Sequence, residues 1–186
     1  MGSRVLHETF DVPRGQQRFR ELIIYVSKKS EDDPHFGAIK LNKILYYSDF
    51  RAFERFGMPL TGVRYHKLKL GPAPKSLIPV RNALEAERAI RVDRVRVGEH
   101  DQHRTVALRA PAMSLFTEDE VQLIDEVIDD LWGQTGSQVS DASHDIRWRL
   151  LNLKDPMPYE LAYLSDEQLT NRDIRRTDEL AIELGW

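Results

Sequence analysis

The first third of the chain has the apolar pattern of two amphipathic helices. In each of two segments, apolar residues recur every three or four positions, the period that gathers them on one helix face. This pattern predicts helices over 16–29 and 38–56. The polar stretch 30–34 separates the two helices, and Gly57, followed by Pro59, is a natural C-terminal stop for the second.

The pattern that follows is shorter and extended. A run over 63–70 comes after a Thr-Gly turn and closes at Gly71-Pro72, because the residue before a proline is disfavoured in the helical region. A third helix is expected over 74–87, where apolar residues return to helical spacing.

Two alternating segments then predict a β-hairpin. Residues 90–97 and 105–110 alternate apolar and polar side chains, as strands with one buried face do. We expect the turn at 98–103. The alternation slips at Asp93-Arg94, which indicates a β-bulge.

The clearest helix start in the chain surrounds Thr117. Its side chain can accept a hydrogen bond from the backbone amide of Glu120, while the Glu120 carboxylate reaches back to the amide of Thr117. Phe116 can pack on Val121 across the same start. The helix is expected to stop at Gly133.

Beyond this helix the expected elements are short. A short helix follows, capped by Ser137 or Ser140. Prolines then interrupt short helices, the last of which covers about 177–184.

Taken together, these elements predict an α+β fold. We expect one mostly helical domain over 1–186, with a small antiparallel β-sheet inserted between helices. Its core covers about 16–150, and 151–186 form a partly helical C-terminal tail.

Composition narrows the chemistry. The chain has no cysteine, which excludes disulfides, thiol catalysis and cysteine-ligated metals. No early apolar run resembles a signal peptide, and no stretch approaches the roughly 20 apolar residues of a membrane span. We therefore expect a soluble cytoplasmic protein without a membrane partner.

Charge is unevenly distributed along the chain. Between Arg55 and Leu84 there are basic residues and no acidic one, whereas between Ala110 and Ile146 the reverse holds. The two stretches either form opposite faces of one domain or steer a charged partner. One alternative function follows, a nucleic-acid-binding regulatory protein that uses the basic 55–84 stretch.

The predicted helix 38–56 carries a stripe of basic and aromatic residues: Lys40, Lys43, Tyr46, Tyr47 and Arg51. Aromatic side chains among cations can bind nucleic acid. Acidic residues on the same helix dilute the positive charge that phosphate contacts need, and tyrosines also sit half-buried at the rim of a core. We therefore favour a partner other than nucleic acid.

No motif for catalysis or cofactor binding is present. The chain lacks a glycine-rich phosphate loop, a zinc-protease helix motif and a serine-hydrolase elbow. His100 and His103 are spaced like metal ligands, but no third ligand stands at a defined offset. We expect no catalytic residue, no metal and no cofactor, and hence a protein that is not an enzyme.

The triplet Ser143-His144-Asp145 contains the residue types of a catalytic triad. Neighbouring residues on a helix do not face one another, so this order does not assemble one. We expect Ser143 and His144 instead to hydrogen-bond the backbone near Trp148 and hold this segment in place.

Four motifs carry a family resemblance. They are the block KLNKILYYSDF over 40–50, Thr61-Gly62-x-x-Tyr65, Gly71-Pro72-x-Pro74 and Ser143-His144-x-x-x-Trp148. In order and spacing they resemble the Panacea domain, also called the SocA-like antitoxin family, from the first helix to about Trp148. One departure is Arg147, where the family often has a proline.

The resemblance implies a bacterial or phage antitoxin of a type II toxin–antitoxin system. Such a protein neutralises a cognate toxin by direct protein binding. The founding type of the family is described as a proteolytic adaptor that delivers its toxin to a AAA+ protease, so both blocking and delivery are open. Neither the residues nor the resemblance indicates an oligomeric state.

The motif residues divide by chemistry into two groups. Gly62, Gly71 and Pro72 suit backbone turns, and Leu41 and Ile44 suit packing. Other motif side chains carry more chemistry than a core requires, and Tyr and basic residues are good interface anchors. We predict partner contacts at Lys40, Lys43, Tyr47, Asp49 and Tyr65. The acidic run 118–130 is a further candidate, which would place Glu118, Asp125 and Asp129 in a basic groove of the toxin.

Overall fold

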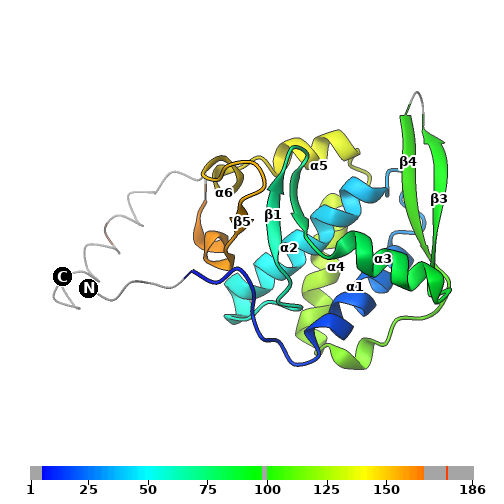
Figure 1. The fold of residues 1–186 in the computed structure, drawn as a ribbon, viewed down its shortest axis with the longest axis horizontal. Helices are drawn as coiled ribbons and strands as arrows, with labels where there is room; N and C mark the ends of the chain where they lie inside the picture. Colours follow the sequence, from blue (N-terminus) through cyan, green and yellow to red (C-terminus); the bar gives the residue numbers. More distant parts are fainter. Residues whose placement is uncertain (1–5, 98–99, 166–174, 176–186) are drawn as a thin grey trace.

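The computed structural model of the protein describes residues 6–97, 100–165 and 175. Its helices are α1 (Gly15–Lys29), α2 (Ala38–Phe56), α3 (Leu77–Ala86), η1 (Met113–Leu115), α4 (Glu118–Leu131), α5 (Gly136–Ala142), α6 (Ile146–Arg149) and η2 (Tyr159–Tyr163), where η marks a 3₁₀ turn. Its strands are β1 (Tyr65–Leu68), β2 (Gly71–Pro74), β3 (Ile90–Val97), β4 (His100–Ala107) and β5 (Pro156–Met157). Figure 1 shows a mostly helical body with small antiparallel sheets, which confirms the predicted α+β class. Within the described residues, no helix has the length and apolar character needed to cross a membrane.

Helices α1 and α2 occupy the ranges that their apolar patterns predict. α2 begins and ends at the predicted residues, and α1 begins one residue earlier. Gly57 ends α2 in the left-handed conformation, with φ of 73°, and its amide donates to the carbonyl of Phe53 at 2.9 Å. Glycine adopts this conformation without a Cβ clash, so the predicted stop is confirmed.

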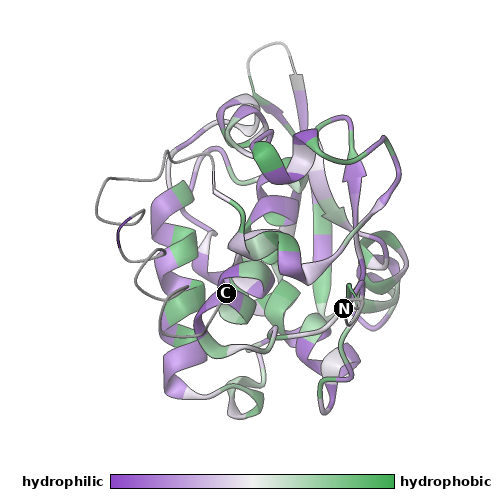
Figure 2. Cartoon of the chain, turned by 90° about the vertical axis from the view of Figure 1, so that its left-hand side faces the viewer, coloured by the Kyte–Doolittle hydropathy of each residue, from purple (hydrophilic) through white to green (hydrophobic). Residues whose placement is uncertain are grey.

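α2 is the central helix of the molecule. One side packs with α1 and α4 in the principal core. Core residues with almost no exposed surface include Leu22, Ile23, Leu41, Leu45, Leu123 and Ile124. Burial of each such side chain stabilises the fold by roughly 1.5–3 kcal/mol. Apolar and polar segments accordingly alternate along the helices in Figure 2.

A second, aromatic core lies against another side of α2. Phe50 stacks on Tyr159 of η2 with ring centroids 5.0 Å apart, and Tyr65 of β1 meets both rings edge-on. The Tyr159 hydroxyl donates to the carbonyl of Val63 at 2.7 Å. Residues 156–163, which the sequence assigns to the tail, are therefore packed against the helical body.

The three-stranded sheet has the order β2-β1-β5 and is antiparallel throughout. Its β1–β2 hairpin corrects the prediction of a single extended run over 63–70. Pro72 and Pro74 lie in β2, so α3 begins at Leu77 rather than at residue 74. The prolines are tolerated because β2 is an edge strand, where a missing amide leaves no neighbouring strand without a bond.

Strand β5 is a second difference from the sequence analysis. Pro156 and Met157 pair with His66 and Tyr65, in a segment where the prolines indicate only breaks between short helices. A two-residue strand has no periodicity of its own, so only its partner reveals it. The predicted helix over 177–184 lies outside the described residues.

The β3–β4 hairpin runs without a bulge from Ile90 opposite Ala107 to Val97 opposite His100. The predicted bulge at Asp93-Arg94 is therefore wrong, and the predicted turn at 98–103 is too long. In Figure 1 the outer part of this hairpin projects from the helical body. Side chains there are partly exposed on both faces, so the fold does not require strict alternation.

The two later helices start at threonine caps. Thr117 and Glu120 form the predicted capping box, with N···O distances of 3.3 and 2.8 Å. α5 is capped by Thr135 and Gln138 in the same way, not by Ser137 or Ser140. The Ser140 hydroxyl is instead bonded to the carbonyl of Leu70, 3.1 Å away.

Candidate functional site

The four motifs meet inside the protein, and α2 provides their common support. Lys40, in the first turn of α2, is 1% exposed, and its Nζ lies 2.7 Å from Oδ2 of Asp33. The other Asp33 oxygen accepts from the backbone amide of His35 at 2.9 Å. This buried ion pair therefore fastens the 30–36 loop to α2, and removal of either partner would leave an unpaired buried charge.

Lys43 holds strand β2. Its Nζ donates to the carbonyl of Pro72 at 3.0 Å and is buried without a carboxylate partner among the described residues. Burial disfavours the charged form and lowers the pKa of Lys43 to about 7.

Gly71 explains why the turn of the third motif needs glycine. Its φ is 94°, and a Cβ at this position would overlap the Ser143 hydroxyl and the Lys43 ammonium. Ser143 donates in turn to the carbonyl of Ser140 at 2.7 Å. Residues from three motifs therefore meet at the α-carbon of Gly71.

Asp49 organises the second motif. Its carboxylate accepts from the amide and the hydroxyl of Thr61, and it lies 2.8 Å from the hydroxyl of Tyr65. Although these three donors favour the ionised form, complete burial outweighs them and raises the pKa of Asp49 to about 6. Gly62 follows with φ of 72°, and a Cβ there would overlap the carbonyl of Phe10.

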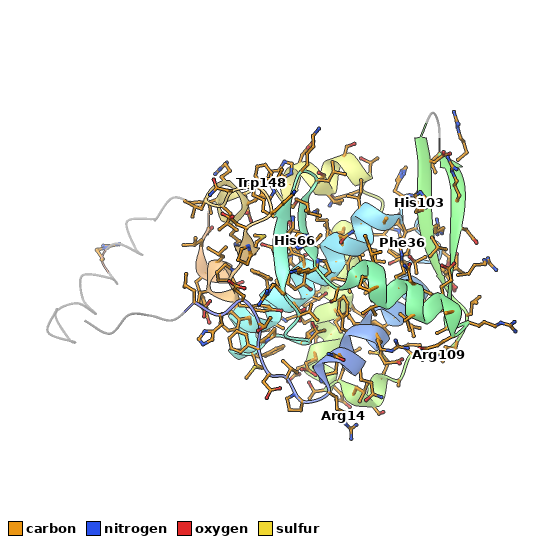
Figure 3. The ribbon with its side chains drawn as sticks, viewed as in Figure 1. Arg14, Phe36, His66, His103, Arg109 and Trp148 are labelled. Carbon is orange, nitrogen blue, oxygen red and sulfur yellow. The ribbon has the colours of Figure 1, made fainter. Side chains whose placement is uncertain are left out.

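Trp148 holds the tip of the β1–β2 hairpin. Its Nε1 donates to the carbonyl of Leu68 at 2.9 Å, and the Lys67 ammonium lies 3.7 Å from its ring centroid. The ring of His144 stacks on the indole at 4.0 Å between centroids. Figure 3 shows Trp148 beside the tip of this hairpin.

The predicted role of Ser143 and His144 needs correction. The backbone amide of Trp148 donates to Oδ1 of Asp145, the N-cap of α6, at 3.2 Å. Ser143 bonds within α5 and His144 stacks on the indole ring, and within the described part of the chain neither side chain forms the predicted hydrogen bond to the backbone near Trp148. The three adjacent residues thus serve three different local contacts rather than one triad.

Burial also corrects the predicted partner contacts. Lys40, Lys43, Asp49 and Tyr65 have 0–1% of their surface exposed, and the polar group of each is bonded within the fold. Side chains without accessible surface cannot line an interface in this conformation. Tyr47 is half-buried, with the Arg51 guanidinium 5.6 Å from its ring centroid, so its partner contact remains a prediction.

Helix α4 uses much of its negative charge within the molecule. Asp125 lies 2.6 Å from the hydroxyl of Tyr25 and 2.9 Å from the Lys29 ammonium. Glu126 pairs with Arg55 at 2.8 Å. The remaining α4 ion pairs join Glu120 to Arg18 and Asp130 to Arg51.

Two of the three predicted contacts on α4 nevertheless stay available. Glu118 and Asp129 are exposed, and neither forms an ion pair with a described residue. At Arg55, the first residue of the basic stretch, the two stretches contact each other through the ion pair with Glu126. This pairing also weakens the nucleic-acid alternative, because Arg55 pairs with Glu126, Arg64 pairs with Glu8 at 3.1 Å, and Lys67 is buried under Trp148.

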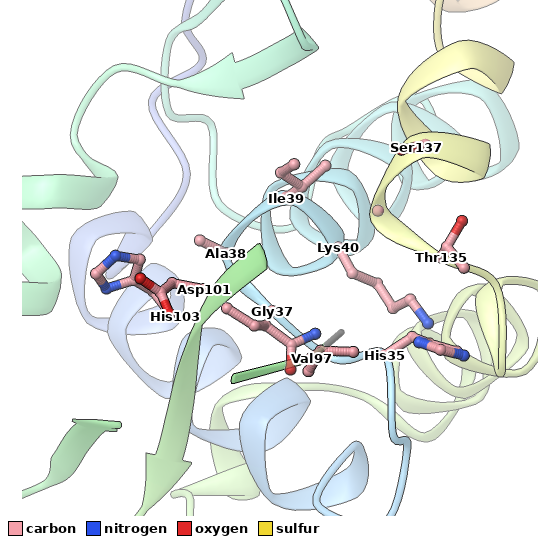
Figure 4. A pocket seen from close by; sticks show the side chains of 12 residues that line it. His35, Gly37, Ala38, Ile39, Lys40, Val97, Asp101, His103, Thr135 and Ser137 are labelled. Carbon is pink, nitrogen blue, oxygen red and sulfur yellow. The ribbon is translucent and has the colours of Figure 1, made fainter. Parts of the chain in front are cut away.

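A cavity of about 670 Å³ lies between the first turns of α2 and α5 and the β3–β4 hairpin (Figure 4). The imidazoles of His35 and His103 line it, and the latter residue lies in β4 rather than in the predicted turn. Among the described residues, no hydrogen bond joins either imidazole to a hydroxyl or a carboxylate. Residues 6–97, 100–165 and 175 contain no group of three or more potential metal ligands.

Several of these contacts carry no signal in the sequence. Asp33 lies in a polar stretch that the pattern marks only as a helix end, and nothing local pairs it with Lys40. Asp145 is a typical N-cap residue, but the helix that it caps has four residues and shows no apolar period. Such a short helix is identifiable only from its tertiary contacts.

The motifs thus define a scaffold in which buried polar groups attach loops and strands to one central helix. The chain matches the family described as Antitoxin SocA-like, Panacea domain, over residues 41–149, which is more than half of its length. It therefore belongs to this family, and an antitoxin role in general terms follows. No curated protein and no solved structure matches the chain.

Proposed function

We propose that the protein is an antitoxin that neutralises a cognate toxin by direct protein–protein contact in the cytoplasm, and that it is not an enzyme. The observation that carries this proposal is the family match over residues 41–149. The buried position of the charged motif side chains supports it, because they maintain a fold and are not directed at a substrate. A binding protein needs a shaped surface rather than convergent catalytic groups.

The test uses the product of the adjacent gene. Expressed alone, this product should arrest growth, and co-expression of the antitoxin should restore it. The two proteins should also co-purify. A neighbouring product that is harmless when expressed alone, or that never associates with this chain, contradicts the proposal.

Blocking and proteolytic delivery are separated by a purified system. If the antitoxin blocks its toxin, a stoichiometric amount inhibits toxin activity without any protease. If it acts as an adaptor, inhibition requires a AAA+ protease, and the toxin's half-life in cells lengthens when that protease is deleted.

The toxin-facing surface predicted from the sequence is the acidic run of α4, together with Tyr47. Of the three predicted α4 contacts, Glu118 and Asp129 could enter a basic groove without breaking an ion pair to a described residue. The double variant Glu118→Lys/Asp129→Lys should therefore weaken binding and reverse its salt dependence. Unchanged affinity and unchanged salt dependence would exclude this surface.

A further inference from the structure

Four exposed leucines occupy two segments that lie side by side. Leu68 and Leu70 are at the tip of the β1–β2 hairpin, with 37% and 53% of their surface exposed. Leu150 and Leu153 follow α6, with 62% and 56% exposed. We call these four residues the leucine surface. Clustered apolar side chains on a protein surface mark interaction sites, whereas scattered ones do not.

Backbone bonds join the two segments that carry the leucines. The amide of Lys154 donates to the carbonyl of Lys67 at 2.8 Å, and the amide of Lys67 donates to the carbonyl of Asp155 at 3.0 Å. The Trp148 indole bonds the carbonyl of Leu68 from the same side. In Figure 1 the tip of β1 lies beside α6.

Hydrogen bonds from neighbouring side chains hold the two segments of the leucine surface in place. The Ser140 hydroxyl bonds the carbonyl of Leu70, and the Lys67 ammonium donates to the carbonyl of Leu151 at 2.8 Å while lying over Trp148. The buried contacts of Lys43 and Gly71 fix the β2 side of the same hairpin tip. An interface formed in advance loses less conformational entropy on binding, which favours affinity.

Charge around the leucines is positive. Lys69 and Lys154 are exposed, one on each of the two segments. The nearby carboxylates are engaged in local contacts, since Asp155 accepts from the amide of Asn152 at 2.8 Å and Asp145 caps α6. This combination of exposed apolar and cationic side chains complements an apolar segment that carries carboxylates.

We propose that the leucine surface is the docking site for the toxin, and that it binds an apolar segment of the toxin bearing Asp or Glu side chains. This inference rests on the proposed antitoxin function and names the surface that performs it. The motif contacts then have a functional consequence, because Lys43 and Gly71 fix the hairpin tip and Trp148 links this tip to α6. The leucine surface would bind acidic side chains of the toxin, whereas the acidic run of α4 would bind basic ones. Charge variants therefore distinguish the two surfaces.

Binding of the adjacent gene's product to purified variants tests the proposal. Leu150→Ser/Leu153→Ser should weaken binding about tenfold or more, as loss of interface anchors does. Ile78→Ser and Leu108→Ser are matched controls, because these side chains are 65% and 48% exposed on other parts of the molecule. Their affinities should stay within about twofold of the wild type, since isolated exposed apolar residues are ordinary surface.

A charge variant tests the partner chemistry without altering the leucines. Lys69→Glu/Lys154→Glu should weaken binding and abolish its decrease with added salt. A thermal unfolding curve for each variant shows whether the fold is retained. This second variant still decides the question if the serine variant unfolds.

The possible outcomes distinguish failure of the proposed docking site from failure of the proposed antitoxin function. If the wild type binds the neighbouring product and both surface variants bind equally well, the docking site is overturned and the antitoxin function stands. If the wild type does not bind, both fail together. Loss of self-association in the leucine variants, or loss of binding to vesicles of anionic lipid, with toxin affinity unchanged, would assign the surface to another occupant and overturn the proposal.

Discussion

Several side chains that the sequence predicts at an interface are buried in this protein, where they hold loops and strands against α2. Lys40 holds the 30–36 loop, Lys43 holds β2 and Asp49 holds the turn at Thr61. A buried polar side chain can form a hydrogen bond with a buried backbone group that an apolar residue would leave unsatisfied. The same residue types serve at surfaces and in interiors, so composition alone does not separate the two roles.

Replacement of Gly71 by Ala should destabilise the protein by about 2–4 kcal/mol, because backbone strain at positive φ adds to overlap with Ser143 and Lys43. Gly57→Ala is the control. Its φ of 73° is also left-handed, but nothing lies within 4 Å of the added Cβ. It should lose only about 1 kcal/mol. Urea unfolding measures both, and equal losses would show that the overlap at residue 71 is relieved without strain.

The buried Lys43 amine should make stability depend on pH. The folded-state pKa is about 7, whereas the unfolded amine keeps its proton up to about pH 10.5. Between these values the unfolded state binds more protons, so this group makes the free energy of unfolding rise with pH. Below pH 7 both states are charged, and the full burial penalty applies to the folded protein.

Lys43→Met removes this dependence. The difference in unfolding free energy, wild type minus variant, should rise by about 1.4 kcal/mol per pH unit between pH 7.5 and 9.5. Urea unfolding of both proteins across this range measures it. A constant difference would mean that the amine stays charged in the folded protein.

At the scale of elements, the sequence predicts those parts whose determinants are local. The ranges of α1 and α2 follow from apolar period and helix stops, and the start of α4 follows from the Thr117 capping box. β2 and β5 depend instead on pairing with β1, from residues up to 92 positions away (Tyr65 with Met157). The contacts of Lys40, Lys43 and Trp148 escape prediction for the same reason, since each joins segments that no local pattern connects.

The cap of α5 provides a test at this scale. Thr135→Ala should destabilise the protein by about 1 kcal/mol, because Thr135 accepts from the amide of Gln138 in the capping box. Ser137→Ala, at a cap position that the sequence favours, should change stability by less than about 0.5 kcal/mol. Thermal unfolding of the two variants compares them. A larger loss for Ser137→Ala would place the helix start two residues later.

At the scale of the whole molecule, basic side chains of α1 and α2 form ion pairs with acidic side chains of α4. Arg18, Lys29, Arg51 and Arg55 from α1 and α2 pair with carboxylates of α4. The three exposed pairs, those of Lys29, Arg51 and Arg55, add little stability, typically below about 1 kcal/mol each. Their larger effect is on the external field, because each pair removes a cation that could otherwise attract phosphate.

The protein should therefore not bind nucleic acid through its basic stretch. Affinity for DNA or RNA depends on the number of phosphates that free Lys and Arg side chains neutralise, and it falls steeply with salt. Arg55 and Arg64 are paired with Glu126 and Glu8, and the net charge of the chain is −3. We expect no mobility shift of single-stranded or duplex oligonucleotides at about 50 mM salt, where contacts to phosphate are stronger than at physiological salt.

Glu8→Gln/Glu126→Gln provides the matched comparison, since it releases both arginines without adding positive side chains. If pairing is what suppresses phosphate contact, this variant should gain weak binding that disappears as salt is raised. Glu118→Gln/Asp129→Gln changes the net charge equally but breaks no ion pair with a described residue, so it should gain less. Equal gains in the two variants would mean that net charge, rather than the pairing of individual arginines, controls the interaction. Tight, salt-sensitive binding by the wild type would contradict the expectation directly, because it would show that the cations outside these ion pairs, Lys69 among them, suffice for phosphate contact.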